Sequence, residues 1–325
     1  MTKGQIMEKW YLNKLYEETD QPTLRFAFQG TVNWMRALAI SVEDESFNQQ
    51  LEIIYKNVKR KNYNKTADLI AFENILMSIH NLHSIQSIND CISNPYSIAR
   101  TQIVSWYYTI YYASSAMIGA SSGTVQETHT NTAKVWQTEF IEKDLVAHPF
   151  SLSLNTLVEK TVKESIDDFR DGNAFTLDNY PTDINESYGA IISYLNGTAK
   201  YKKWQSEEEI KKSKEFKRLK VDNFRTKKAR ELRDEKLSRG IVNFLVQAFR
   251  YRGKAHYRDT VFLSYGDNRE KELKQFNKDL EIVAKAFLKM ASKYVQLRVK
   301  ENDWNKFLED LDNNLRFDFD TNFLR

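Results

Sequence analysis

The sequence predicts an all-α protein. Its 325 residues include only 4 prolines and 10 glycines, whereas an all-β sandwich needs a turn about every 8–12 residues and usually builds it with these residue types. Hydrophobic residues make up 41% and charged residues 28% of the chain, which allows a core and argues against disorder. Apolar side chains recur at three- and four-residue spacing, which is the period of an amphipathic helix.

The N-terminal part of the chain reads as a series of helices. Residues 1–20 predict a short helix, and residues 24–60 hold further helical pattern in which Asp44 and Ser46 can cap the second segment. Residues 65–87 repeat apolar side chains at helical spacing. Pro95 ends that helical region, because a proline disfavours helical backbone geometry in the residue before it.

The middle and C-terminal parts continue the pattern. A long helix is expected over residues 96–120 and ends near Gly123, since glycine is the usual left-handed residue after a helix. The next helix begins near Thr128. We expect Thr128 or Thr130 to cap this helix and favour that over a ligand contact of the adjacent His129. Residues 170–185 read as a loop, and helical pattern returns from residue 186 and again over residues 270–299.

Residues 200–239 stand apart by charge. They contain 16 Lys/Arg and 8 Asp/Glu, a local net charge of +8 in a chain whose total is +4. We predict an exposed helical segment or hairpin outside the main core. Clustered cations of this kind bind phosphates, although a solvated helix with ion pairs at four-residue spacing is the explanation that we favour. The candidate nucleic-acid contacts in this stretch are Lys227, Lys228 and Arg230.

The segment 247–259 carries the most chemistry in the chain: Arg250, Arg252, Lys254, His256, Arg258 and Asp259. Arg252 and His256 are four residues apart and share a helix face. A histidine can act as general base or acid, and an arginine binds phosphate through paired N–H groups. We therefore predict His256 as catalytic, Arg250 or Arg252 as the phosphate ligand, and Lys254 and Arg258 as nucleic-acid contacts. The plain alternative is a solvated basic helix.

Two segments together suggest a family. The first is tyrosine-rich and runs through Tyr107-Tyr108, Tyr111-Tyr112-Ala113, Gly119 and Gly123 to Thr128-His129. In the second, five residues separate Arg250 from His256, whereas three separate Arg252 from it. Together they resemble the HEPN superfamily, whose signature is an arginine and a histidine separated by four to six residues. Tyr251 follows Arg250 where the family usually has a polar residue.

The resemblance implies a helical bundle over residues 61–300 that contains the basic insertion at about 200–239. Residues 1–60 would add an N-terminal helical extension and residues 301–325 a tail. It further implies a metal-independent endoribonuclease of a bacterial anti-phage defence or toxin–antitoxin system. The alternative is a non-catalytic subunit of a defence complex that binds nucleic acid or protein. Expected partners are RNA or another nucleic acid, a protein from a neighbouring gene, and a second copy in a homodimer; no cofactor or metal is expected.

Other classes find little support in the sequence. Cys91 is the single cysteine, so neither an intrachain disulfide nor a cysteine zinc site is expected. His80 and His83 share a helix face but lack an obvious third metal ligand. There is no phosphate-binding loop or dinucleotide fingerprint. The N-terminus lacks an apolar signal region, and residues 103–120 are too polar for a membrane span, so we expect a cytoplasmic protein.

Overall fold

The structure is a computed structural model that describes residues 10–11, 14, 24–91, 94–256, 261, 263 and 268–324. The described residues form helices joined by turns and loops, and they contain no strand. One isolated antiparallel bridge joins Leu154 to Val242. The predicted all-α class is therefore confirmed.

The helices follow one another in chain order. They are α2 (Leu24–Glu43), α3 (Glu45–Tyr55), α4 (Lys65–Cys91), α5 (Ala99–Ser122), α6 (His129–Trp136), α7 (Glu159–Arg170), α8 (Ile184–Lys212), α9 (Lys214–Arg218), α10 (Lys227–Leu237), α11 (Phe244–His256), α12 (Glu270–Arg298) and α13 (Glu301–Asn314). Short helical turns also occur at η1 (Pro95–Ser97), η2 (Gln137–Ile141) and η4 (Asn322–Leu324).

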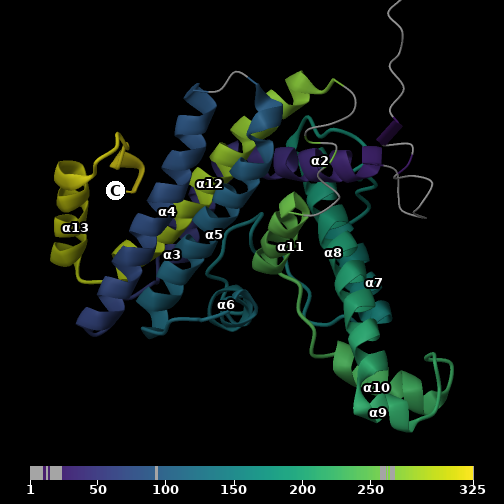
Figure 1. Cartoon of the computed structure of the whole chain (residues 1–325). Coiled ribbons are helices and arrows are strands. Elements are labelled where there is room, and N and C mark those ends of the chain that lie inside the picture. Colours follow the sequence, from purple (N-terminus) through teal and green to yellow (C-terminus); the bar gives the residue numbers. More distant parts are fainter. Residues whose placement is uncertain are drawn as a thin grey trace, which may run out of the picture.

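The body of the molecule is built around α4, α5 and α12, which lie side by side (Figure 1). Helix α2 crosses one end of this layer, and α11 lies between α5 and the long helix α8. Four tryptophans from α2, α5, α6 and α13 are fully buried in one hydrophobic cluster: Trp34, Trp106, Trp136 and Trp304. Large aromatic side chains contribute strongly to core burial, so these helices are held by a common core.

Buried side chains from all three predicted segments join this cluster. Phe47 comes from the N-terminal segment, Ile110 from the middle and Leu308 from the tail. Boundaries at residues 60 and 300 thus cut through a shared core. The domain division itself stays a prediction.

Several helix ends agree with the local sequence signals. The Asp44 side chain accepts a hydrogen bond from the Ser46 amide at 2.9 Å and caps α3. Thr128 accepts from the Asn131 amide at 3.2 Å and caps α6. Gly123 ends α5 with φ 71°, in the left-handed region that favours glycine. These predictions are confirmed.

Residues 213–239, which we call the basic tip, project from the body at the far end of α8 (Figure 1). They include α9 and α10, and Lys227, Lys228 and Arg230 are all exposed. The tip packs on the end of α8 in a small cluster, in which the buried side chains are Phe216 and Ala229 of the tip and Ile210 of α8. Residues 200–239 thus form an exposed helical segment outside the main core, as predicted, in which residues 200–212 are the second half of α8 and residues 213–239 the tip.

The histidine pair on α4 packs against the C-terminal tail. The rings of His80 and His83 stack on Phe317, with centroids 5.7 Å and 4.3 Å from it. No group of three His, Cys, Asp or Glu side chains gathers as a metal site among the described residues. In the same part of the chain, every helix is too short or too polar to cross a membrane.

Candidate functional site

Helix α11 carries the residues that the sequence singles out. Its buried face is formed by Phe244, Ala248, Tyr251 and Ala255. The Tyr251 hydroxyl donates to the backbone oxygen of Thr31 on α2 at 2.7 Å. This packing fixes the rotation of α11 about its axis, so the direction of each remaining side chain is determined by its position in the helix.

Arg252 lies in a cradle of aromatic rings. Its guanidinium carbon is 4.9 Å from the ring centre of Tyr107, 5.0 Å from that of Phe249 and 5.8 Å from that of Tyr108. One terminal nitrogen donates to the Tyr108 hydroxyl at 3.1 Å. Such contacts attract a cation to the face of each ring.

No carboxylate among the described residues pairs with the charge of Arg252. Its Nε atom is buried and has no hydrogen-bond partner, and the residue makes no ion pair within the described part of the chain. Removing a charge from water without pairing it costs free energy. A bound anion would therefore stabilise this position.

His129, the first residue of α6, lies beside Arg252. Its Nδ1 is hydrogen-bonded to the Tyr107 hydroxyl at 2.7 Å. The ring centre is 4.6 Å from that of Tyr111 and 5.1 Å from that of Phe249. Burial, and secondly the positive charge of Arg252, lowers the pKa of His129 below its ordinary value. The imidazole is then mostly neutral at pH 7 and able to accept a proton.

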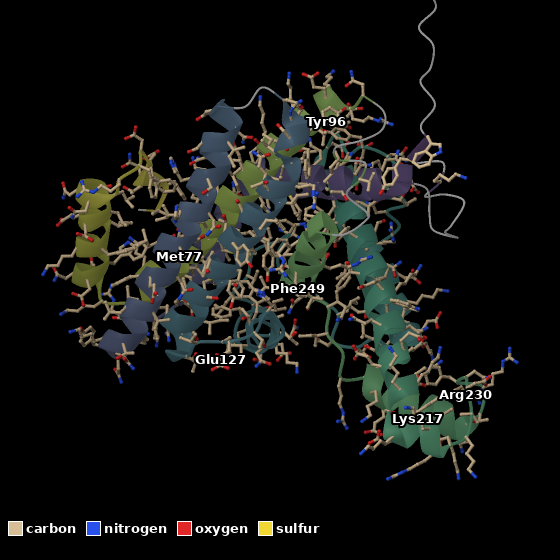
Figure 2. The ribbon with its side chains drawn as sticks, viewed as in Figure 1. Met77, Tyr96, Glu127, Lys217, Arg230 and Phe249 are labelled. Carbon is tan, nitrogen blue, oxygen red and sulfur yellow. The ribbon has the colours of Figure 1, made fainter. Side chains whose placement is uncertain are left out.

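We call this group of side chains the α11 site: Tyr107, Tyr108, Tyr111, His129, Phe249 and Arg252. Figure 2 shows Phe249 near the middle of the molecule, between the body and α8. Its side chain is 41% exposed, whereas Tyr107 is buried and the other members are half-buried. The site thus offers solvent an aromatic surface with a guanidinium and a neutral imidazole at its base.

Arg250 points to the other side of the helix. Its Nη1 donates to the Thr198 hydroxyl at 3.1 Å, and its guanidinium lies 4.5 Å from the ring centre of Tyr201 on α8. Residues two positions apart in an α-helix point in directions that differ by about 200°. This explains why the side chains of Arg250 and Arg252 diverge. The two predicted phosphate ligands therefore belong to different surfaces.

The structure does not describe the side chains of the other residues predicted in this segment. His256 is the last residue of α11, and nothing is described of its side chain or of that of Lys254. Arg258 and Asp259 lie outside the described residues. The roles proposed for these residues stay predictions.

Lys227, Lys228 and Arg230 form a separate surface on the basic tip. Figure 2 shows Arg230 and Lys217 at the far end of the molecule from Phe249. Arg230 donates to the Arg225 carbonyl at 3.0 Å, and Lys227 lies 3.9 Å from Glu231. The predicted nucleic-acid contacts are thus divided between the α11 site and the tip.

His129 is the residue whose position sequence reasoning missed. The Thr128-His129 pair was recognisable as a helix start, and Thr128 does cap the helix. The contact of His129 with the Arg252 environment depends on how α6 packs beside α5 and α11. The only sequence signal for it was the match of these two residues to the HEPN pattern.

Comparison of this chain with protein-family models, with curated proteins and with solved structures finds no match. The resemblance to the HEPN superfamily accordingly stays a prediction, and function has to be argued from the α11 site itself.

Proposed function

We propose that this chain binds single-stranded RNA at the α11 site. The observation that carries the proposal is the guanidinium of Arg252, which is held among aromatic rings and has no carboxylate partner in the described structure. A phosphate would supply the missing negative charge and match the N–H groups of the guanidinium. The exposed ring of Phe249 offers a face on which a base can stack, an interaction of about 1–3 kcal/mol per base.

The basic tip would add a second, non-specific contact. Its exposed lysines and arginines can neutralise backbone phosphates and release counterions, so this part of the affinity falls as salt rises. Base stacking at the α11 site depends less on salt. An RNA bound by both surfaces would therefore lose only part of its affinity at high salt.

Metal-independent cleavage of the RNA is the second candidate function, and the position of His129 favours it. A neutral imidazole beside a guanidinium can take the proton of a ribose 2′-hydroxyl. The 2′-oxygen then attacks the adjacent phosphorus, the bond to the 5′-oxygen breaks, and the leaving oxygen takes up a proton. The products are a 2′,3′-cyclic phosphate and a 5′-hydroxyl end. His256 remains the proposed donor of that second proton.

The biological setting is part of the same proposal. The resemblance to the HEPN superfamily supports a role in a bacterial anti-phage defence or toxin–antitoxin system, with a cytoplasmic location. It also supports a homodimer and a protein partner encoded by a neighbouring gene. If cleavage is absent, the RNA-binding site would serve a non-catalytic subunit of a defence complex.

The test is a fluorescence-anisotropy titration of the full chain with a labelled single-stranded RNA. Arg252→Gln should weaken binding roughly tenfold, because one charge-assisted phosphate contact is worth about 1.5–3 kcal/mol. Arg60→Gln is the matched control, since Arg60 is an exposed arginine whose partner is Glu301 on α13. The control should bind like the wild type.

Equal affinities of Arg252→Gln and the wild type, with both proteins folded by circular dichroism, would contradict the proposal. Cleavage is assayed separately in the presence of a chelator by detecting cyclic-phosphate ends. Loss of these ends in both His129→Gln and His256→Ala, with RNA affinity kept, is the result expected if the two histidines move the protons.

A further inference from the structure

A second candidate site lies where α2 meets the first turns of α12. The structure has a pocket of about 710 Å³ there, lined also by the loop at residues 180–182. Pockets for small ligands commonly measure about 300–1,000 Å³. It shares no residue with the α11 site.

The lining of this pocket is strongly cationic. Five of its side chains are Lys or Arg and a single one, Glu272, is acidic: the cations are Arg36, Arg269, Lys271, Lys274 and Lys278. Such a concentration of one charge sign raises the local concentration of ligands of the opposite sign. The ligand class that fits is an anion.

Three of these cations already have carboxylate partners. Arg36 lies 3.0 Å from Asp279, Arg269 lies 3.2 Å from Glu272, and Lys274 lies 2.7 Å from Glu270. Lys271 and Lys278 have no ion pair within the described residues, and both are exposed. Lys274 and Lys278 are four residues apart on α12, a spacing at which like charges destabilise a helix. A multivalent anion would relieve this repulsion.

Arg36 is held in place in the pocket lining. Its Nη1 donates to the Asp279 carboxylate at 3.0 Å, and Gln275 donates to the same oxygen at 2.8 Å. Asp279 is buried, so it holds the guanidinium firmly. Arginine has five N–H groups, and this bond uses one of them. The others remain to bind a phosphate.

Part of the pocket lining, which we call its wall, is aromatic and apolar. Tyr180 is 40% exposed there, beside Pro181 and Val32. The Asn33 side-chain amide holds the loop before it by donating to the Leu177 carbonyl at 2.7 Å and to the Asn179 carbonyl at 2.9 Å. The wall is therefore formed before a ligand arrives. A planar base can stack on the Tyr180 ring.

We infer that this pocket binds a nucleoside polyphosphate. The phosphates contact Arg36, Lys271 and Lys278, and the base lies against Tyr180. An inorganic phosphate would leave the aromatic wall and most of the volume unused. This inference does not depend on RNA binding at the α11 site.

Isothermal titration calorimetry of the full chain with ATP, GTP and inorganic tripolyphosphate tests the inference. We expect ATP or GTP to bind more tightly than tripolyphosphate. The double variant Lys271→Gln/Lys278→Gln should weaken nucleotide binding at least roughly tenfold, since two charge-assisted contacts are lost. Both lysines are exposed, so the fold should persist.

The matched control is Lys56→Gln/Lys59→Gln after the end of α3, which removes the same charge from two exposed lysines outside both proposed sites and should leave nucleotide affinity unchanged. Tyr180→Ala should weaken ATP or GTP and leave tripolyphosphate unaffected. The inference is overturned if neither nucleotide binds, if the control variant loses as much affinity as the pocket variant, or if tripolyphosphate binds as tightly as the nucleotides. None of these outcomes bears on the Arg252→Gln titration with RNA.

Discussion

The body and the basic tip are both helical but are stabilised very differently. The body buries four tryptophans and many other apolar side chains in one cluster. The tip buries Phe216 and Ala229 against Ile210 of α8, with half-buried neighbours around them. At its end, Leu237 joins a second small cluster with Leu154 and Leu157. Since hydrophobic stabilisation scales with buried apolar area, the body should resist local opening far more than the tip.

The difference originates in the sequence. Helix α8 buries side chains up to Ala199 and then none until Ile210, so its second half leaves the body as charged residues replace apolar ones. Two side-chain caps then organise short helices: Ser213 at the start of α9 and Thr226 at the start of α10. The tip is thus a charged surface on a small local core, whereas the α11 site is built into the main core.

The largest expected effect comes from a matched pair of phenylalanine substitutions. Phe287 is fully buried in the body, with ring centres 5.0 Å from Phe150 and 5.5 Å from Phe244. Phe287→Ala should lower the free energy of global unfolding by about 3–5 kcal/mol, as burial of a large ring is lost and a cavity is left. Phe216→Ala in the tip should change global unfolding little and instead speed amide exchange of α9 and α10.

Chemical denaturation and hydrogen exchange measure the two effects. If Phe216→Ala lowered the global unfolding free energy as much as Phe287→Ala does, the tip would be part of the body's cooperative unit and the comparison would fail.

The next effect is the pH dependence of the unfolding free energy that histidines cause. It belongs to the body, because residues 213–239 contain no histidine. Burial lowers the pKa of His148 to about 4, from about 6.5 in an unfolded chain. The native state therefore binds fewer protons than the unfolded state between these values. Stability from this residue is present above about pH 6.5 and is lost as the pH falls toward 4, by up to about 3 kcal/mol.

Urea unfolding at a series of pH values measures this loss. His148→Gln should flatten the profile over this range, leaving a smaller slope from His129, whose pKa is also lowered. A variant profile as steep as that of the wild type would show that other groups cause the acid destabilisation.

The smallest effect compares two threonine caps. Thr128 caps α6 in the body, and Thr226 caps α10 in the tip. Replacing either by alanine should cost about 1 kcal/mol. For Thr128→Ala, this loss should appear in the free energy of global unfolding. For Thr226→Ala, it should appear only as faster hydrogen exchange of the α10 amides. Identical global losses would argue against an independently opening tip.

Local features of this fold could be predicted because their causes are local. Asp44, Gly123 and Thr128 act within a few residues of their own position, and the sequence shows them. The charge excess of residues 200–239 likewise predicts exposure, because unpaired lysines are costly to bury.

The composition of the candidate site could not be predicted in the same way. The cradle around Arg252 requires α5 and α6 to meet α11, and the stacking of His83 on Phe317 requires the tail to return to α4. Residues far apart in the chain make these contacts, and periodicity says nothing about which helices become neighbours. The divergence of Arg250 from Arg252 follows from helix geometry, but which surface each one meets does not.

The central claim is that RNA binds at the α11 site in the body and that the basic tip gives only an accessory contact. Ultraviolet cross-linking of the full chain to single-stranded RNA, followed by mass spectrometry of the peptides, tests it most directly. We predict cross-links at Tyr108, Tyr111 or Phe249, which survive Lys227→Gln/Lys228→Gln and are lost in Arg252→Gln. Cross-links confined to residues 213–239, unchanged by Arg252→Gln, would contradict the account.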